Sequence, residues 1–408
     1  MENQSVEKAR QEKIEFVHGT AAYLLRHAVE EDWEQIRNLY TPDDIANFNI
    51  KEAASRSAFH ATICSQDYFW VVCINQSNGK MEGSTIVQID HENRIGRVIG
   101  LVIDNDELIG VIIEKLTEFA RVVLTEKENI VDSFYMELRT CIPGVDFEHS
   151  PLSTKVFGIY PNLKKVSDYE TLLLLVFASS KIKEKRDGNV KVLPPEVKQI
   201  YTIAAANLGL PDVAEIAEGN YADERKTEES LKISFEAITA PMFIQRRFAQ
   251  RKKTSTTNVR YFSFFEPDLL LICDDGITEV FVYFNRESRY CMLISENMKR
   301  SHYEKYLEEV CNTMSFLGAR YVEIMLPADD TELLFRALRA RFIPSAYYPC
   351  MHPENGFLKD YVVFSRTFEA FDFNKIQITG KAKAYLDHYI KVWSKFYLSN
   401  ALQLFEEV

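Results

Sequence analysis

The chain has 408 residues, of which 46% are hydrophobic and 12% aromatic. This composition is typical of a folded globular protein with room for two or three domains. The formal net charge of −12 argues against a nucleic-acid partner, because such binding depends on clustered Lys and Arg that neutralise phosphates. No apolar stretch reaches the ~18 residues needed to span a bilayer, and charged residues occupy the N-terminus where a secretory signal is apolar. We therefore expect a cytoplasmic protein without a membrane span.

The cysteines and histidines show no metal or redox motif. Seven cysteines stand apart in the sequence, and no two have the close spacing of a zinc or disulfide-exchange motif. The histidines lack the i, i+4 or short-loop spacing of metal ligands. We expect reduced, mostly buried cysteines and no metal site.

The first part of the chain alternates strand and helix patterns after a tail over residues 1–20. Residues 21–180 read as a strand, a pair of helices, three strands, a long helix, a strand, a short helix and a closing strand. The long helix is expected at 106–124 and the short helix near 150–158. Charged residues and a Pro-Pro pair then mark a boundary, so we place an N-terminal domain at 21–180.

The second part repeats this order. Residues 181–258 read as a helical linker or as the opening helices of a second module. Residues 259–370 then give three strands, a helix expected at 302–317 and a further strand, and 371–408 holds a last amphipathic helix. The repetition predicts an internal duplication of one α/β module. The expected fold class is α/β (α+β), with two modules that each contain a mixed, mostly antiparallel sheet flanked by helices.

This order of elements resembles the GNAT superfamily of acyl-CoA N-acyltransferases. The run Leu24-Leu25-Arg26-His27-Ala28-Val29-Glu30-Glu31-Asp32-Trp33 looks like the first strand and helix of that family, and Phe342-Ile343-Pro344 looks like the lead into its last strand. The resemblance covers about 21–178 and 259–368. It implies acetyl-CoA or another acyl-CoA as the cofactor and a small-molecule or protein amine as the acceptor.

The resemblance also implies that the pyrophosphate of coenzyme A lies at the N-terminus of the long helix, where backbone N–H groups and the helix dipole attract an anion. In the first half, Asp104, Asp106 and Glu107 stand at the start of this helix and would repel a pyrophosphate. Asp104 and Glu107 also have the spacing of a capping box. The first half therefore departs from the pattern of the family, and its donor site is expected to be degenerate.

The second half offers a better site for an anion. Lys299, Arg300 and Ser301 stand before its long helix, and they are the candidate cofactor-binding residues. Ser301 and Glu304 have capping-box spacing, however, and no glycine lets the backbone approach a phosphate. An ordinary capped helix with two exposed bases therefore stays open as the alternative.

Acyl transfer to an amine requires a base for the amine proton and often an acid for the leaving thiolate. Glu137 and Glu323 lie in apolar strands at corresponding places of the two repeats, so they are candidate bases with raised pKa values, unless they point outward from the pleat. Tyr160 and Tyr348 are the matching candidate acids, with packing as the alternative role. Glu323 and Tyr348 of the second half are expected to act together.

A basic run precedes the second repeat and has two interpretations. It comprises Arg246, Arg247, Arg251, Lys252 and Lys253. Such a run is typical of a solvated helix C-terminus. It would also suit an anionic ligand or an acyl carrier protein as a partner.

Two functions from different classes remain open. The first is an acyltransferase that moves an acyl group from acyl-CoA, or from an acyl carrier protein, to an amine. The second is a catalytically silent binding or scaffolding protein with a GNAT-like fold. A cleft with apolar walls and a buried acid would favour catalysis, and a cleft filled by aromatic side chains would favour the silent protein.

Overall fold

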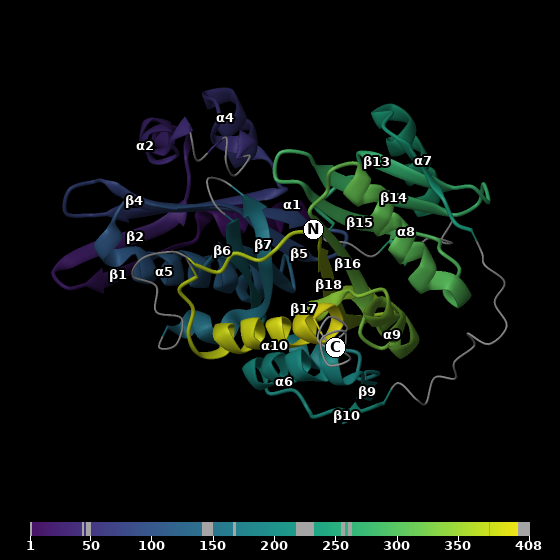
Figure 1. Cartoon of the computed structure of the whole chain (residues 1–408). Helices are drawn as coiled ribbons and strands as arrows, with labels where there is room; N and C mark the ends of the chain where they lie inside the picture. The colour runs from purple at the N-terminus through teal and green to yellow at the C-terminus, as the bar shows by residue number, and fades with distance from the viewer. Residues whose placement is uncertain are drawn as a thin grey trace.

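A computed structural model describes residues 2–42, 45, 50–140, 150–165, 169–217, 232–253, 258–259, 263–374 and 376–398. Two sets of strands lie side by side and meet in the middle of the molecule (Figure 1). The helices lie on the faces of this layer.

The first half contains two short N-terminal elements and then alternating strands and helices. Its elements are α1 (Glu2–Gln11), β1 (Lys13–His18), β2 (Ala21–His27), η1 (Glu30–Asp32), α2 (Trp33–Leu39), α4 (Arg56–Cys64), β3 (Tyr68–Asn75), β4 (Met81–Asp90), β5 (Ile95–Ile103), η3 (Asp106–Leu108), α5 (Ile109–Arg121), β6 (Ser133–Arg139), η5 (Pro151–Lys155), β7 (Val156–Lys165) and β8 (Tyr169–Ala178).

The segment after β8 and the second half follow the same pattern. Their elements are η6 (Ile182–Lys185), β9 (Val192–Leu193), α6 (Pro195–Leu208), β10 (Ala214–Glu215), β11 (Phe235–Ile238), α7 (Pro241–Lys253), β12 (Asn258–Val259), β13 (Leu269–Cys273), β14 (Glu279–Asn285), β15 (Tyr290–Glu296), η9 (Arg300–His302), α8 (Tyr303–Phe316), β16 (Tyr321–Pro327), α9 (Thr331–Arg339), β17 (Ile343–Glu354), β18 (Phe357–Thr367) and α10 (Gly380–Tyr397).

One sheet runs through both halves, and its strand order is nearly the same from either end. The order is β1-β2-β3-β4-β5-β6-β8-β7 followed by β17-β18-β16-β15-β14-β13-β11. Each half thus contributes a mixed, mostly antiparallel sheet with flanking helices, and the predicted fold class is confirmed. That both modules would share a single sheet is not evident from the sequence.

In each half, one pair of parallel strands separates after a short contact. Strands β5 and β6 pair only from Ile95↔Ser133 to Arg97↔Tyr135. Strands β15 and β16 pair only from Tyr290↔Tyr321 to Met292↔Glu323. Because helices α5 and α8 connect these strands, each half opens beside the N-terminus of its long helix. These two openings are called the splays.

The halves join where β7 and β17 pair through Gly158 and Ala346. In β7, Gly158 pairs with Leu174 of β8, and in β17, Ala346 pairs with Val363 of β18, so the two residues hold corresponding positions. A Cβ atom at Gly158 would lie 2.0 Å from the Cβ of Ala346. The close approach of the two backbones therefore requires glycine on one side of this junction, which we call the seam.

Helices α6 and α10 lie side by side against the seam (Figure 1). Buried Tyr385 and Tyr389 of α10 join the main apolar core, and the Tyr389 hydroxyl lies 2.9 Å from Ser365 Oγ. His388 and Lys395 of α10 contact Glu196 of α6. The amphipathic pattern near the C-terminus thus becomes a helix packed on the junction of the halves.

Two expectations about local structure are wrong. The short helix expected near 150–158 is only the 3-10 turn η5, after which the chain enters β7. Asn105, and not Asp104, caps the 3-10 turn η3 that leads into the first long helix, since its side chain accepts from the Leu108 N–H at 3.2 Å, and Asp104 pairs with Lys80 at 2.9 Å. Among the described helices, none combines the length and apolarity needed to cross a membrane.

Candidate active site at the seam

Glu323 is a buried carboxylate at the point where the second splay begins. It is the last residue of β16 that pairs with β15, and it is 2% exposed. Burial, followed by the charge of Glu137, raises the pKa of Glu323 well above its ordinary value, and a hydrogen bond with Tyr290 opposes this shift. Its Oε2 atom has no hydrogen-bond partner among the described residues. A buried, partly unsatisfied acid requires an explanation beyond packing.

Tyrosines from both halves surround this carboxylate. Burial raises the pKa values of Tyr160, Tyr290 and Tyr321 well above the ordinary value, and the charge of Glu323 is the next cause for each. These side chains therefore keep their protons at neutral pH. The buried Tyr160 hydroxyl has no partner among the described residues, so it is a free donor within electrostatic range of Glu323.

Glu137 enters the same cluster from the first half with an arginine beside it. Arg97 Nη2 lies 3.5 Å from Glu137 Oε2, and the two side chains are 20% and 15% exposed. Burial alone would lower the pKa of Arg97, but the charges of Glu137 and Tyr135 raise it. The Arg97 guanidinium also lies 4.4 Å from the ring centre of Phe265 in the second half. Arg97 thus provides a fixed positive charge at the solvent-accessible side of the cluster.

The structure brings Glu137 and Glu323 together, but they are not equivalent in register. The last paired residues before each splay, Tyr135 in β6 and Glu323 in β16, hold equivalent positions. Two residues further along these strands, Glu137 corresponds to Met325. The two repeats therefore differ by two residues from the correspondence expected from the sequence. The position of Glu323 is therefore occupied by a tyrosine, Tyr135, in the first half, and the position of Glu137 is occupied by Met325 in the second.

Of the two candidate tyrosines, the one within electrostatic range of Glu323 comes from the opposite half. Tyr160 and Tyr348 each lie two residues beyond the seam residues Gly158 and Ala346, so they are equivalent. Tyr348 crosses toward the first half, where its hydroxyl lies 3.2 Å from Ser133 Oγ and its ring lies 6.2 Å from that of Tyr135. Tyr160 correspondingly crosses toward the second half, where burial and then the charge of Glu323 raise its pKa.

The structure thus places Tyr348, the acid expected beside Glu323, at Ser133 of the first half, whereas Tyr160 lies within electrostatic range of Glu323. By position in the two repeats, Glu323 and Tyr160 correspond to Tyr135 and Tyr348, whose rings are in contact. Of these four residues, only Glu323 is a carboxylate.

Four members of the cluster were not predicted from the sequence, namely Arg97, Tyr135, Tyr290 and Tyr321. The signal was present for Arg97, because it is the one charged residue in the apolar strand β5. The tyrosines gave no signal, since buried tyrosines are common in cores.

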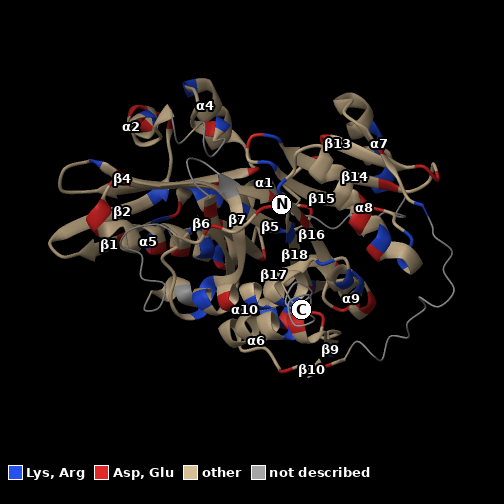
Figure 2. Cartoon of the chain, in the orientation of Figure 1, with Lys and Arg blue, Asp and Glu red and all other residues tan. Residues whose placement is uncertain are grey.

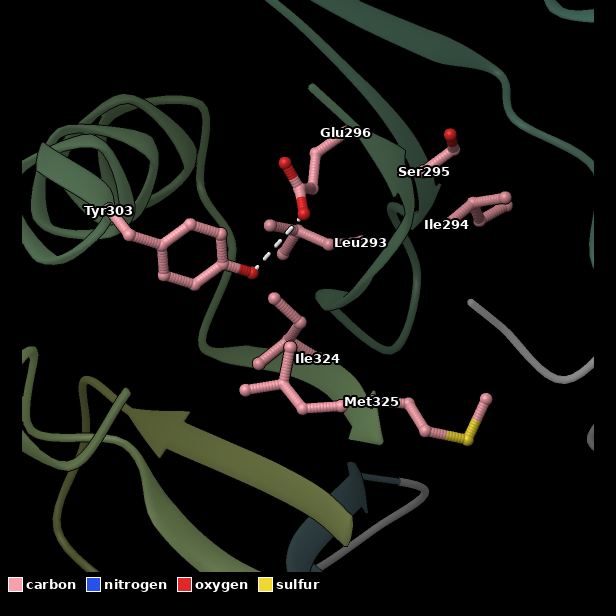
Figure 3. A pocket seen from close by; sticks show the side chains of 8 residues that line it. Leu293, Ile294, Ser295, Glu296, Tyr303, Ile324 and Met325 are labelled. Carbon is pink, nitrogen blue, oxygen red and sulfur yellow. Dashed lines mark hydrogen bonds between the residues drawn. The ribbon is translucent and has the colours of Figure 1, made fainter. Parts of the chain in front are cut away.

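The second splay is nearly closed in this structure (Figure 3). Strands β15 and β16 and Tyr303 of α8 line a cavity of about 10 Å³, which is room for about one water molecule. Glu296 lies at its edge, where one carboxylate oxygen accepts from the Met298 N–H at 2.6 Å and the other lies 3.4 Å from the Tyr303 hydroxyl. An internal carboxylate therefore already occupies a backbone donor near the start of the second long helix.

The candidate cofactor-binding residues stand beside this splay with acidic partners. Lys299 Nζ lies 3.8 Å from Asp275, and Arg300 binds Asp330 with its shortest contact at 2.5 Å. Ser301 offers its backbone oxygen to Arg336 at 3.1 Å. These contacts neutralise the two bases in the absence of a ligand.

The predicted capping box of Ser301 and Glu304 does not form. Neither η9 nor α8 has a side-chain cap, and Glu304 faces Arg336 and Arg339 of α9 at 3.5 and 3.7 Å. The neighbouring helix α9 thus competes for the glutamate.

Basic and acidic residues are interspersed along the chain in both halves (Figure 2). In the basic run of α7, Arg247 and Arg251 bind the buried Glu279 at 2.8 and 2.6 Å, so part of the run serves packing. No group of three or more His, Cys, Asp or Glu side chains within the described ranges could hold a metal ion.

No protein-family model matches this sequence, and neither does any curated protein. Solved structures with a similar arrangement include a ribosomal-protein-S5-alanine acetyltransferase from Vibrio fischeri, with 12% identity over 40% of this chain and 96% of that one, at a TM-score of 0.31. A spermidine N-acetyltransferase variant from Vibrio cholerae has 12% identity, coverages of 39% and 95%, and a TM-score of 0.29. An aminoglycoside 6′-N-acetyltransferase from Enterococcus faecium has 9% identity, coverages of 38% and 96%, and a TM-score of 0.27. These weak likenesses assign no activity to this chain.

Proposed function

We propose that this protein is an N-acyltransferase built from two GNAT-like modules, with one catalytic centre at the seam. The observation that carries the proposal is the buried Glu323, which has a raised pKa and an unpartnered Oε2 atom and lies within electrostatic range of Tyr160, whose hydroxyl is unpartnered as well. A carboxylate with a raised pKa is the stronger base, and a neutral phenol is a proton donor. These are the two groups that acyl transfer from a thioester to an amine requires.

In the proposed reaction, the nitrogen of the acceptor amine attacks the thioester carbonyl while Glu323 accepts a proton from that amine. Tyr160 donates its proton to the leaving thiolate. Arg97 pairs with Glu137 and partly cancels its negative charge. The charge of Glu137 therefore raises the pKa of Glu323 less than an unpaired carboxylate would. The splay supplies the path along which a thioester would reach these groups.

The donor would be acyl-CoA, or an acyl carrier protein, held near Lys299 and Arg300. Both bases are more than half exposed, and exposed ion pairs contribute about 0–1 kcal/mol each. A diphosphate that makes several charge-assisted hydrogen bonds would outcompete Asp275 and Asp330 for them. The tip of the donor requires Tyr303 and Glu296 to move, because the splay cavity is too small for it.

The second candidate function is a silent binding or scaffolding protein. The closed second splay favours it, since Tyr303 and Glu296 fill the place where a thioester would lie. Only a ligand that opens this splay would make the centre at the seam productive.

A thiol-release screen of acetyl-CoA and longer acyl-CoA donors against amine libraries distinguishes the two functions. The acyltransferase predicts turnover that falls by about 10²-fold to 10⁴-fold in Glu323→Gln, because that variant keeps the shape of the side chain and loses the base. Glu184→Gln is the matched control, since Glu184 is exposed and lies in η6. Release of no thiol with any donor would favour the silent protein.

A further inference from the structure

A second group of reactive side chains lies on the surface of the first half, on η1 and α4. His60 Nδ1 lies 2.7 Å from Glu30 Oε2, and His60 Nε2 lies 3.8 Å from Cys64 Sγ. Arg56 binds the other oxygen of Glu30 at 2.9 Å. We call Cys64, His60 and Glu30 the Cys64 cluster. Its order of thiol, imidazole and carboxylate is that of an activated nucleophile with its base and orienting group.

The spacing along α4 makes this arrangement possible. His60 and Cys64 are four residues apart, so their side chains share one face of the helix. Hydrogen bonds from His60, and then from Arg56, lower the pKa of Glu30, which is therefore ionised at neutral pH. An ionised Glu30 favours the tautomer with the proton on Nδ1, and this leaves Nε2 as the acceptor that faces the thiol.

A cation lies beside the thiol as well. Arg10 of α1 donates to the backbone oxygens of Cys64 and Ser65, the latter at very short range. Burial lowers the pKa of Arg10, and the charge of Cys64 opposes this shift, so the guanidinium and the sulfur lie within electrostatic range. The C-terminal end of a helix is negative and would disfavour a thiolate. Arg10 counters that effect by binding the terminal carbonyls and adding a positive charge.

Cys64 differs from the other described cysteines in its exposure to solvent. It is exposed, whereas the other five are buried. Burial raises the pKa of each buried thiol, which keeps those thiols protonated. The buried thiols are Cys73, Cys273, Cys291, Cys311 and Cys350. Cys141 lies outside the described residues.

We propose that the Cys64 cluster is a thiol–disulfide exchange site that takes low-molecular-weight disulfides such as oxidised glutathione. His60 Nε2 accepts the proton of the Cys64 thiol, and the resulting thiolate attacks one sulfur of the disulfide. A new S–S bond forms between Cys64 and that sulfur, the original S–S bond breaks, and the leaving thiolate takes the proton from His60. One disulfide and one protein thiol thus give one mixed disulfide and one free thiol. This proposal is independent of the acyltransferase function.

The test is the rate at which oxidised glutathione modifies Cys64, followed by intact-protein mass spectrometry in a Cys141→Ser background. His60→Gln and Glu30→Gln are compared with Glu31→Gln, an exposed neighbour of Glu30. At neutral pH we expect His60→Gln to slow the exchange by about tenfold, since only a few per cent of an ordinary thiol is ionised there. Glu30→Gln should slow it by less, and Glu31→Gln should leave it unchanged.

The pH dependence separates activation from access or folding. Above about pH 9.5, any exposed thiol is ionised, so the rates of the variants should converge on that of the Cys141→Ser parent. Equal rates for His60→Gln and its parent at neutral pH would overturn the proposal. A deficit of His60→Gln that persists at high pH would also overturn it, because the residue would then act through structure and not through the proton.

Discussion

At the scale of single residues, the chemistry of this molecule is concentrated in a few side chains whose protonation burial controls. Glu323 is the clearest example, because its ordinary ionisation is opposed by burial and by the charge of Glu137. Arg97 lies on the open side of the same cluster and carries the balancing charge. A buried acid of this kind lowers stability once it ionises, and proteins accept that cost most often where the acid has a function.

Glu323→Gln should become progressively more stable than the wild type as pH rises. In the folded state the pKa of Glu323 is raised, so between its ordinary pKa of about 4.3 and the raised value the folded protein binds more protons than the unfolded chain. Stability from this group is therefore full below the ordinary pKa and is lost as pH rises toward the raised one. The loss is about 1.4 kcal/mol for each pH unit in that window, and glutamine is free of it.

Thermal melting of both proteins from about pH 4 to about pH 8 checks this expectation. The difference in Tm should grow with pH for Glu323→Gln until the raised pKa is reached and level off above it, and it should stay flat for the control Glu184→Gln, whose side chain is exposed. A constant difference across the range would show that Glu323 ionises normally in the folded state.

At the scale of elements, the feature that joins the two halves is a pair of strands that the sequence patterns did not predict. Strands β7 and β17 join the halves, yet β7 contains Pro161, and β17 contains Pro344, Pro349 and Pro353. Prolines inside an apolar run argue against a central strand. Register shifts accommodate Pro161, between Tyr160 and Lys164 in β7, and Pro349, between Tyr348 and His352 in β17. Turn signals and alternation could not reveal this.

Gly158→Ala should weaken the seam. Its new Cβ would lie 2.0 Å from the Cβ and 2.6 Å from the Cα of Ala346, so the backbones must move apart. We expect a loss of about 1–3 kcal/mol, which is typical of overpacking. Gly188→Ala, where nothing lies within 4 Å, should stay within about 0.5 kcal/mol.

The exchange of the two residues provides the sharper test. Gly158→Ala combined with Ala346→Gly restores one small and one larger residue across the seam, so it should recover most of the stability measured by denaturant unfolding. No recovery in the double variant would contradict the proposed contact.

The second long helix permits a further test of the proposed donor site. Lys299→Glu combined with Arg300→Glu replaces two attractive charges near its N-terminus by two repulsive ones. Calorimetric titration with acetyl-CoA should then show affinity reduced by at least about tenfold, given charge-assisted contacts of about 1.5–3 kcal/mol each. Asp104→Lys in the first half is the comparison and should leave the affinity unchanged. Equal affinity of the double variant and the wild type would move the donor elsewhere.

At the scale of the whole molecule, the sequence predicts the order of elements well, and it predicts their assembly poorly. Alternation and helix periodicity identified strands such as β8 and β16 and the two long helices, because those signals are local. The single sheet, the crossing of Tyr160 toward Glu323 and the two-residue offset between Glu137 and Glu323 depend on pairing between distant strands. Candidate residues could thus be predicted, and their partners could not.

The central claim is that Glu323 and Tyr160 form the one working centre, while the equivalent pair Tyr135 and Tyr348 does not act in catalysis. The most direct test compares thiol release by Tyr160→Phe and Tyr348→Phe with the acyl donor and amine that give the highest wild-type turnover. Both tyrosines are buried equivalents at the seam, but the Tyr348 hydroxyl bonds to Ser133 and the Tyr160 hydroxyl is unpartnered, so any structural cost of losing the hydroxyl falls on Tyr348→Phe and not on Tyr160→Phe. We predict that Tyr160→Phe reduces turnover by about 10²-fold and that Tyr348→Phe stays close to the wild type. A loss confined to Tyr348→Phe, or equal activity in both variants, would contradict the account.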